Sequence, residues 1–254
     1  MHRFYLPPDH CRGPALLLSG GEAHHAVHVL RVRPGDRVTV LDGAGGEFAC
    51  EVAKTGHDKV GLRIVEKHSH PSPPCELTLL QALPKGKLLE SIIQKATELG
   101  AARVVPLLSE RVVVHLASGD ASRKADKWQS IAIEAVKQCG SAWLPKVEAP
   151  LTPAQFLARR EPFELSLIGS LQSDARHPRQ YFQTFRSEHG RNPETVGVWV
   201  GPEGDFTPGE LQAIQAAGAK PITLGPLVLR ADTAAIYCLS VLNYEMQAPR
   251  ITDY

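Results

Sequence analysis

A proline-rich segment, HSHPSPP at residues 68–74, separates two stretches of the chain with different hydrophobic patterns. Three prolines within seven residues suit an extended connector, because proline lacks a backbone N–H and disfavours helices and central strands. Short strand-like runs precede this segment, whereas apolar runs alternate with helical patterns after it. We therefore predict one domain over residues 1–72 and a second over residues 73–254.

The first stretch predicts three short strands, over residues 37–42, 48–55 and 59–68. The glycine-rich turn DGAGGEF joins the first two, and a turn near Gly56 joins the last two. A leading segment, HHAVHVLRV, predicts a short helix. Strands and turns of this size indicate a small β-barrel or sheet, an architecture that commonly serves as a binding module.

The second stretch predicts alternating strands and helices. Strands are expected over residues 75–84, 103–109, 163–170, 195–200 and 221–225, and helices over 88–100, 126–140, 207–219 and 232–247. Gly100 suits the end of the first of these helices. This alternation is typical of an α/β fold with a mostly parallel sheet buried on both faces. Ligands bind such sheets beyond the carboxyl ends of the strands.

Three of the predicted strands end in loops rich in glycine or proline: LSLIGSLQS at 165–173, VGVWVGPEGDF at 196–206 and ITLGPLVLRADT at 222–233. Glycine at a strand end lets backbone groups approach a ligand without an intervening side chain. Three such ends in one sheet predict one pocket, although each loop by itself is also explained as a tight turn.

Part of the second loop has a structural explanation. Thr207 as N-cap, Pro208 at the first helical position and Glu210 three residues after the cap form a capping box. This pattern leaves the preceding Gly-Pro-Glu-Gly unexplained. Asp232 is explained either as a cap of the last helix or as a functional carboxylate, while Arg230 has no evident capping role.

Composition and missing motifs exclude several classes of protein. Hydrophobic residues make up 43% and charged residues 22%, which is ordinary for a globular chain. Apolar runs fall short of the roughly 20 residues that a membrane span needs, and the N-terminus lacks an apolar signal core, so we expect a cytoplasmic protein without a membrane partner. The signatures of P-loop, dinucleotide-binding, α/β-hydrolase and zincin enzymes are missing.

Cysteine and histidine patterns do not indicate a metal site. The five cysteines are scattered and never form C-x-x-C, so we interpret them as small core residues. His24, His25 and His28 have no further ligand at suitable spacing beyond Glu22, which favours surface or core histidines. We therefore predict no metal.

The formal net charge of +1 conceals a local excess of positive charge. Residues 85–146 hold ten lysines and arginines against six acids, whereas residues 147–254 hold nine against twelve. Such a patch suits a nucleic-acid partner, although an ordinary solvated surface explains the charges equally well.

Long motifs in this sequence resemble a known family. GPEGDFTPGEL, followed by LGPLVLRADTAA, resembles the SPOUT methyltransferases, specifically the RsmE-type enzymes that methylate N3 of a uridine in small-subunit ribosomal RNA. HHAVHVLRVRPGDRVTVLDG is similar to the PUA-like barrel of that family. KGKLLESIIQKATELGAARVVPLLSERVVV and DKWQSIAIEAVKQCG are similar to the first half of its catalytic domain. The resemblance covers nearly the whole chain.

The resemblance implies an α/β fold: a mostly parallel SPOUT-type sheet with a C-terminal trefoil knot, preceded by a small PUA-like β-barrel that binds RNA. It implies a homodimer that binds S-adenosylmethionine in the knot, largely through backbone groups. Carried over to this sequence, the cofactor residues are Gly169, Ser170, Gly201, Pro202, Glu203, Gly204, Leu224, Gly225 and Leu229.

The implied reaction is methylation of N3 of a uridine in 16S ribosomal RNA within the small subunit. The N3 proton must be lost, so a base or a stabiliser of the developing uracil anion is needed. Arg230 is the expected stabiliser, and either Glu203 or Asp232 takes the proton or orients the ribose. The residues expected to bind RNA are Arg3, Arg12, Arg31, Arg33, Arg37, Lys95 and Arg111.

The chain departs from the family pattern at three positions. Ser141 stands where the family usually has an arginine, Leu227 where it usually has a basic residue, and Asp232 where glutamate is common. These positions lie on the expected RNA side. Ser141 and Leu227 therefore leave open a non-catalytic RNA-binding or ribosome-assembly factor on the same fold. A SPOUT methyltransferase that acts on transfer RNA is a second alternative, because the cofactor loops do not specify the substrate.

Overall fold

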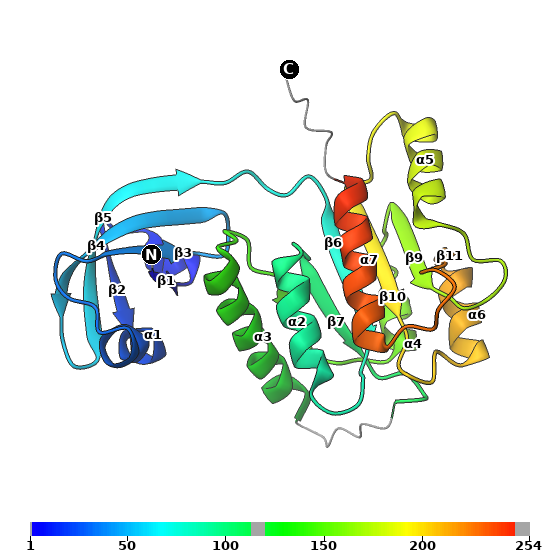
Figure 1. Cartoon of the computed structure of the whole chain (residues 1–254), viewed down its shortest axis with the longest axis horizontal. Coiled ribbons are helices and arrows are strands. Elements are labelled where there is room, and N and C mark those ends of the chain that lie inside the picture. Colours follow the sequence, from blue (N-terminus) through cyan, green and yellow to red (C-terminus); the bar gives the residue numbers. More distant parts are fainter. Residues whose placement is uncertain (1, 113–119, 247–254) are drawn as a thin grey trace. The chain divides into compact units, whose positions relative to one another are not determined.

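The computed structural model describes residues 2–112 and 120–246, and these form two compact units (Figure 1). The first comprises Met1–Ser72 with Ile133–Leu144, and the second comprises Pro73–Ala132 with Pro145–Tyr254. The division thus falls after Ser72, as it does in the sequence-based assignment, but it also places residues 133–144 with the first unit.

The first unit is a curled, mixed five-stranded sheet with the strand order β1-β3-β4-β5-β2. Its strands are β1 (His2–Tyr5), β2 (Ala15–Ser19), β3 (Arg37–Leu41), β4 (Gly46–Thr55) and β5 (Lys59–Ser69). β1 pairs with β3 in parallel, and the other pairs are antiparallel. The three predicted strands are confirmed, but the short strands β1 and β2 were not predicted. β1 and β2 are the two edges, and they do not pair among the described residues, so the sheet does not close into the predicted barrel.

Short helical segments accompany this sheet. They are the 3-10 helix η1 (Pro8–Cys11), α1 (Gly20–His24) and the π-helix η2 (His25–Val29), so the predicted short helix is confirmed as two consecutive helical turns. Alternate residues of β4, such as Phe48, Cys50 and Val52, face the core. They pack with Phe4 and Leu18 from the edge strands.

Residues 133–144 join the first unit through its glycine-rich turn. The N–H of Gly45 donates to the carbonyl oxygen of Ala142 at 2.9 Å, and the indole N–H of Trp143 donates to the carbonyl oxygen of Pro71 at 3.0 Å. A Cβ atom at Gly45 would lie 2.6 Å from the Trp143 ring, and its φ of +93° lies outside the range of most side-chain-bearing residues. Glycine is therefore required in this turn.

The second unit has a six-stranded sheet with the strand order β11-β9-β10-β6-β7-β8. Its strands are β6 (Glu76–Ala82), β7 (Arg103–Leu107), β8 (Lys146–Val147), β9 (Leu165–Gly169), β10 (Thr195–Val200) and β11 (Lys220–Ile222). Every pairing is parallel. The prediction of an α/β fold with a parallel sheet is confirmed, and only the two-residue strand β8 was not predicted.

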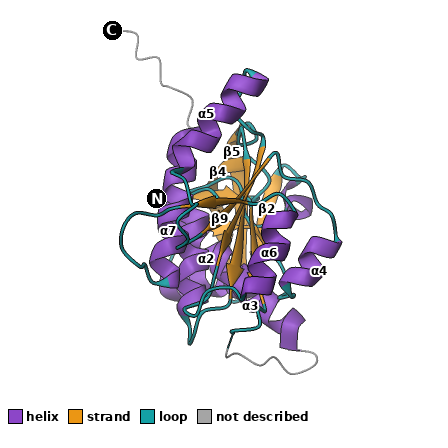
Figure 2. Cartoon of the chain, turned by 90° about the vertical axis from the view of Figure 1, so that its right-hand side faces the viewer, coloured by secondary structure: helices purple, strands orange, loops and turns teal. Residues whose placement is uncertain are grey.

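Helices cover both faces of this sheet (Figure 2). The helices are α2 (Leu88–Glu98), α3 (Asp120–Cys139), α4 (Pro153–Ala158), α5 (Pro178–His189), α6 (Pro208–Ala216) and α7 (Ala231–Met246), and α3 belongs to this unit only as far as Ala132. α4 and α5 were not predicted, and Gln247, at the predicted end of the last helix, lies outside the described residues. Gly100 ends the α2 segment with a φ of +78°, as predicted, and Asn243 of α7 donates to the carbonyl oxygen of Leu99 at 2.7 Å.

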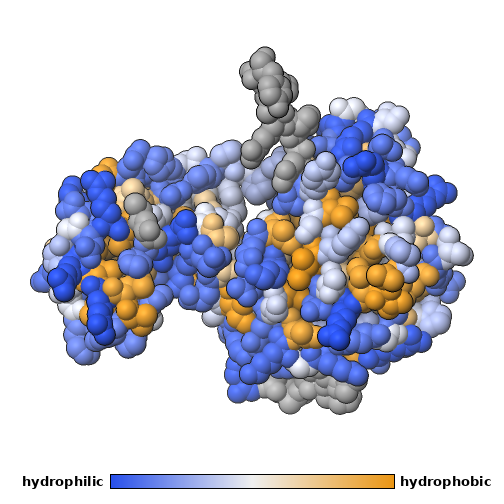
Figure 3. Space-filling model, viewed as in Figure 1, coloured by the Kyte–Doolittle hydropathy of each residue, from blue (hydrophilic) through white to orange (hydrophobic). Residues whose placement is uncertain are grey.

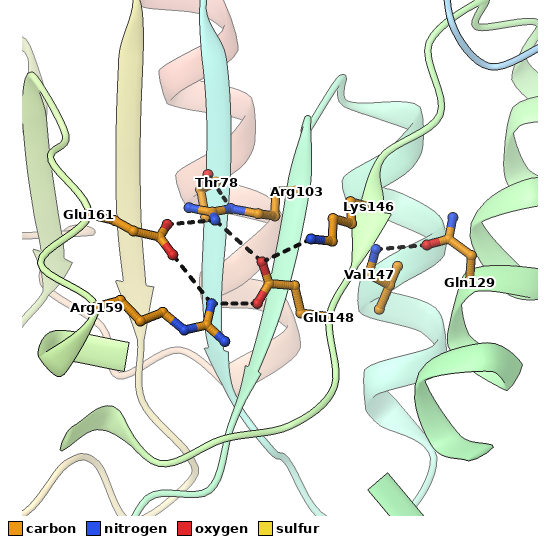
Figure 4. A network of polar contacts seen from close by, with 8 residues as sticks. All are labelled: Thr78, Arg103, Gln129, Lys146, Val147, Glu148, Arg159 and Glu161. Atoms are coloured by element: carbon orange, nitrogen blue, oxygen red, sulfur yellow. Dashed lines mark hydrogen bonds and ion pairs between the residues drawn. The ribbon is translucent and has the colours of Figure 1, made fainter. Parts of the chain in front are cut away.

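An ion-pair network lies at the amino end of the sheet (Figure 4). Arg103 of β7 bonds to Glu161 at 2.6 Å and to Glu148 at 3.3 Å, while Arg159 bonds to Glu148 at 2.7 Å. Glu148 is buried, so these bonds compensate the cost of removing its charge from water. The network therefore ties the 148–161 connection to the sheet.

Four of the five cysteines are buried, as predicted, but Cys139 is exposed because it lies at the end of α3. No helix within the described ranges is long and apolar enough to cross a membrane.

Candidate functional site

Three neighbouring strands, β9, β10 and β11, bring their carboxyl ends together at one edge of the sheet. The loops that follow them line a pocket of about 290 Å³, together with Ala231 and Ala234 of α7. Of the nine residues predicted to bind a cofactor, eight line this pocket: Gly169, Ser170, Gly201, Pro202, Glu203, Leu224, Gly225 and Leu229. Gly204 belongs to the same loop but does not line the pocket.

The Gly-Pro-Glu-Gly loop after β10 is held from several sides. A carboxylate oxygen of Glu203 accepts a hydrogen bond from the backbone N–H of Lys85 at 3.0 Å, and Arg111 donates to the carbonyl oxygen of Gly204 at 2.6 Å. Lys85 follows β6 and Arg111 follows β7, so three strand ends are connected here. A Cβ atom at Gly201 would lie 2.8 Å from Asp205 Oδ1, so a larger residue at this position would require the Asp205 side chain to move.

The predicted capping box after this loop is confirmed. Thr207 accepts a hydrogen bond from the N–H of Glu210, and the Glu210 carboxylate accepts one from the N–H of Thr207. The other carboxylate oxygen of Glu210 accepts from the N–H of Glu110 at 2.9 Å. Glu210 thus serves both α6 and the turn after β7, a second contact that the capping pattern did not reveal.

The loop after β9 runs beside β11. The N–H of Ser170 donates to Ile222 at 3.0 Å, and Arg176 exchanges backbone bonds with Pro221 and Thr223. Tyr181 of α5 donates its hydroxyl to the carbonyl oxygen of Pro221 at 3.1 Å, and burial raises the pKa of this hydroxyl, which keeps it a donor. These bonds fix two of the three pocket loops against each other.

The mouth of the pocket is apolar on one side. Leu227 and Val228 in the β11–α7 loop are 72% and 79% exposed, and Figure 3 shows hydrophobic surface over this loop. Gly225, in the same loop, has a φ of +105° and lines the pocket. Leu227 thus brings apolar surface, and no charge, to the pocket mouth.

Two of the three expected catalytic residues line the pocket, and the third does not. Glu203 and Arg230 both line the pocket, and Arg230 is exposed. Within the described part of the chain, the Arg230 side chain has no hydrogen bond and no ion pair, so it does not pair with Glu203. Asp232 is the second residue of α7 and does not line the pocket; its Oδ1 is buried without a hydrogen-bond partner in the described structure.

Several pocket residues were missed by sequence reasoning. They are Leu171, Val200, Asp205, Leu227, Val228, Ala231 and Ala234. Asp205 follows the Gly-Pro-Glu-Gly motif directly and adopts a φ of +59°, which is uncommon for a residue with a side chain. The apolar members carry no chemical signal in sequence, because they resemble ordinary core residues.

The residues expected to bind RNA are dispersed, and several have structural partners. Arg3 donates to the carbonyl oxygens of Lys137 and Gln138, Arg12 pairs with Asp9, and Lys95 pairs with Glu98. Arg111 holds the pocket loop, as described above. The remaining three, Arg31, Arg33 and Arg37, have exposed side chains in the first unit.

Ser141, which stands where the family usually has an arginine, has a structural partner. Ser141 bonds through its hydroxyl to the backbone of Trp143, so it forms a local turn. Among residues 2–112 and 120–246, no group of three or more His, Cys, Asp or Glu side chains is placed to hold a metal ion.

Family models match both parts of the chain. An RNA methyltransferase domain matches residues 71–243, and an RNA methyltransferase PUA domain matches residues 18–65. The fold and the match over most of the chain together define the class of RNA methyltransferases. The PUA match corresponds to the curled sheet of the first unit.

Comparison with whole proteins narrows this class. The chain is 32% identical over 238 residues to ribosomal RNA small subunit methyltransferase E of Bacillus subtilis, covering 93% of each chain. Its structure is similar to that of ribosomal RNA small subunit methyltransferase E from Neisseria gonorrhoeae bound to S-adenosylmethionine, with a TM-score of 0.82, 28% identity and coverage of 96% and 97%. A Legionella pneumophila protein in complex with the cofactor SAM gives a TM-score of 0.85 at 32% identity, with 95% and 96% covered. The chain belongs to the family of ribosomal RNA small subunit methyltransferase E.

Proposed function

We propose that the protein transfers a methyl group from S-adenosylmethionine to N3 of a uridine in 16S ribosomal RNA of the small subunit. The observation that carries this proposal is the single pocket that three glycine-bearing strand ends form in a chain of this family. Neither a non-catalytic factor nor an enzyme for transfer RNA is favoured by the comparisons.

The residues of the pocket fit S-adenosylmethionine. Gly169, Gly201 and Gly225 leave backbone groups accessible in the lining. Apolar side chains such as Leu229 can enclose a ring, while the carboxylates of Glu203 and Asp205 are suited to a cationic ligand. When bound, the cofactor supplies a methyl group made electrophilic by a positively charged sulfur.

Arg230 and Glu203 are assigned the catalytic roles. Arg230 lines the pocket and has an exposed side chain, so its guanidinium is available to stabilise negative charge on a uracil oxygen as the N3 proton leaves. Glu203 lines the same pocket and is oriented by the N–H of Lys85, which favours it over Asp232 as the proton acceptor. Asp232 is assigned a positioning role at the start of α7.

A homodimer is part of this proposal. The outer face of α7 exposes Tyr237 and Tyr244, and a cavity of about 510 Å³ lies along it between His177 and Glu245. Figure 3 shows apolar surface along α7. Because α7 also begins at the pocket, a second copy on this face would lie close to the reaction site.

Four finer features complete the proposal. The strand ends form a trefoil knot, a feature that the resemblance to the SPOUT methyltransferases implies. Residues 1–72 act as the RNA-binding domain and residues 73–254 as the catalytic domain, in agreement with the positions of the two family models.

Arg31, Arg33 and Arg37 contact phosphates of the RNA. The enzyme acts in the cytoplasm, where ribosomal RNA is found.

Mass spectrometry of nucleosides tests the function. The purified protein, with S-adenosylmethionine, is incubated with small subunits from a strain that lacks the corresponding gene, and the 16S RNA is then digested. We expect one 3-methyluridine per subunit, and none with the Glu203→Gln variant. A methyl group on transfer RNA or on another atom of the base would contradict the proposed substrate, and no transfer to any RNA would contradict catalysis.

A further inference from the structure

Three histidine side chains form a row on the surface of the first unit. His24, at the end of α1, and His28, one turn later in η2, have ring centroids 4.7 Å apart. His57, in the turn between β4 and β5, has its ring centroid 5.8 Å from that of His28. All three side chains are exposed. We call His24, His28 and His57 the imidazole row.

The imidazole row differs in its partners from His68 and His70 of the same unit. His68 and His70 each contact a carboxylate, Glu66 at 3.3 Å and Glu47 at 2.8 Å. Within the described residues, the structure gives the imidazole row ring contacts with one another and no hydrogen bond or ion pair. When protonated, its members would therefore have no internal anion to neutralise them.

The carboxylates on the elements around the imidazole row are paired with, or adjacent to, positively charged groups. On α1, Glu22 is bound by Lys137 at 2.7 Å and by the backbone N–H of Tyr5. Beside it, His25 packs edge-on against Phe4. Arg31 follows η2 and is exposed, while Asp58 and Lys59 at the β4–β5 turn offset one another in charge.

Ring geometry favours an anion over a stacked base or a metal ion. Successive planes in the row are inclined by 41° and 72°, so the rings do not form one flat platform for nucleobases. In the described ranges no set of three ligands is placed for a metal. Each protonated imidazole offers two N–H donors, which suit phosphate oxygens.

We propose that the imidazole row binds phosphates of the RNA substrate and that this binding takes up protons. The inference rests on the proposed function, which supplies the RNA. A phosphodiester placed against protonated imidazoles would offset the repulsion between their positive charges. RNA should therefore bind more tightly as the pH falls through the range in which histidine titrates.

Filter binding of a 16S ribosomal RNA transcript to the full-length protein, at pH 6 and pH 8 and at constant salt, tests this inference. An ordinary imidazole is roughly three-quarters protonated at pH 6 and almost wholly neutral at pH 8. We expect the wild-type affinity to be about tenfold higher at pH 6. In the triple variant His24→Gln, His28→Gln, His57→Gln this ratio should fall below about twofold, with a smaller salt slope.

The matched control is the double variant His68→Gln, His70→Gln, which removes two exposed histidines that have carboxylate partners. It should keep the wild-type pH ratio. The single variant His57→Gln changes only a turn residue and should lower the ratio of the affinities at pH 6 and pH 8 in part. It therefore tests the inference even if the triple variant folds poorly.

Two results would overturn the inference. One is an unchanged pH ratio in a triple variant whose thermal unfolding matches the wild type. The other is an equal loss of affinity at both pH values, which indicates uncharged stacking. Methyl transfer by the wild-type protein is measured on the same transcript and on small subunits. Transfer without the expected pH dependence of binding would contradict this inference alone, whereas no transfer to either RNA would contradict the proposed function.

Discussion

The guanidinium of Arg111 donates a hydrogen bond of 2.6 Å to the carbonyl oxygen of Gly204. This bond joins the segment after β7 to the pocket loop after β10. The N–H of Glu110 makes a second connection to the same region through Glu210. An arginine that the sequence suggests as an RNA contact therefore lies where it can hold the cofactor loop in place.

Arg111→Ala should weaken binding of S-adenosylmethionine in the absence of RNA. A charge-assisted hydrogen bond at an exposed site contributes about 1 kcal/mol, so we expect an affinity loss of about fivefold by calorimetry. Lys95→Ala, which removes a cation paired on α2, serves as the control and should leave cofactor affinity unchanged. If Arg111→Ala changed RNA affinity alone, Arg111 would be an RNA contact and not a support of the loop.

Gly225→Val should abolish cofactor binding. The φ of +105° strains any side-chain-bearing residue, and the new side chain would stand in the pocket lining. Gly218 provides a matched control, since its φ is +103° and it lies outside this pocket. Gly218→Val should lower the melting temperature to a similar extent while retaining cofactor binding. Equal affinity in both variants would show that Gly225 is only a turn residue.

Arg230→Ala should slow methyl transfer by about two to three orders of magnitude with cofactor affinity nearly unchanged, because its contact is expected to matter most in the transition state. Arg230→Lys should restore part of the rate, since an ammonium group cannot reproduce the guanidinium fork. Single-turnover kinetics measure the step. Arg176→Ala, an exposed arginine outside the pocket lining, should retain the wild-type rate. A change in the sedimentation of Arg230→Ala relative to the wild type would instead indicate a structural role.

Glu148→Gln should destabilise the protein by about 3 kcal/mol, because it leaves Arg103 and Arg159 with Glu161 as their only shared partner. Urea unfolding followed by circular dichroism measures this change. Glu194→Gln removes an exposed carboxylate at 3.7 Å from Arg191 and should cost less than about 0.5 kcal/mol. Similar effects in the two variants would show that burial of Glu148 does not determine the strength of its network.

Glu164→Gln should make the protein less sensitive to acid. The hydrogen bond from Arg191 and the N–H of Glu194 hold the pKa of Glu164 at about 2, below its ordinary value. A carboxyl with a lowered pKa stabilises the fold above its unfolded-state pKa of about 4.3 and loses that contribution as the pH falls toward 2. The melting temperature of the variant should therefore change less between pH 6 and pH 3 than that of the wild type. An identical change in both proteins would rule out this contribution.

The sequence by itself determined the order of most strands and helices and the loops that form the pocket. Its signals are local: apolar runs specify buried strands, and Thr207 with Glu210 specifies a helix start through bonds within four residues. Glycines at strand ends marked the pocket because parallel strands bring their carboxyl ends to one edge. The short elements β1, β2 and α4 escaped prediction, since so few residues carry little periodicity.

Only the tertiary structure decided which polar residues act together. Arg111 meets Gly204 across 93 residues, and Arg103 meets Glu161 across 58, so neither partner is visible from local spacing. The same holds for His57, which lies in the turn before β5. It reaches His28 because β5 pairs with β2, the strand that precedes α1 and η2. Side-chain hydrogen bonds of this kind depend on how distant segments pack, and packing is a property of the whole fold.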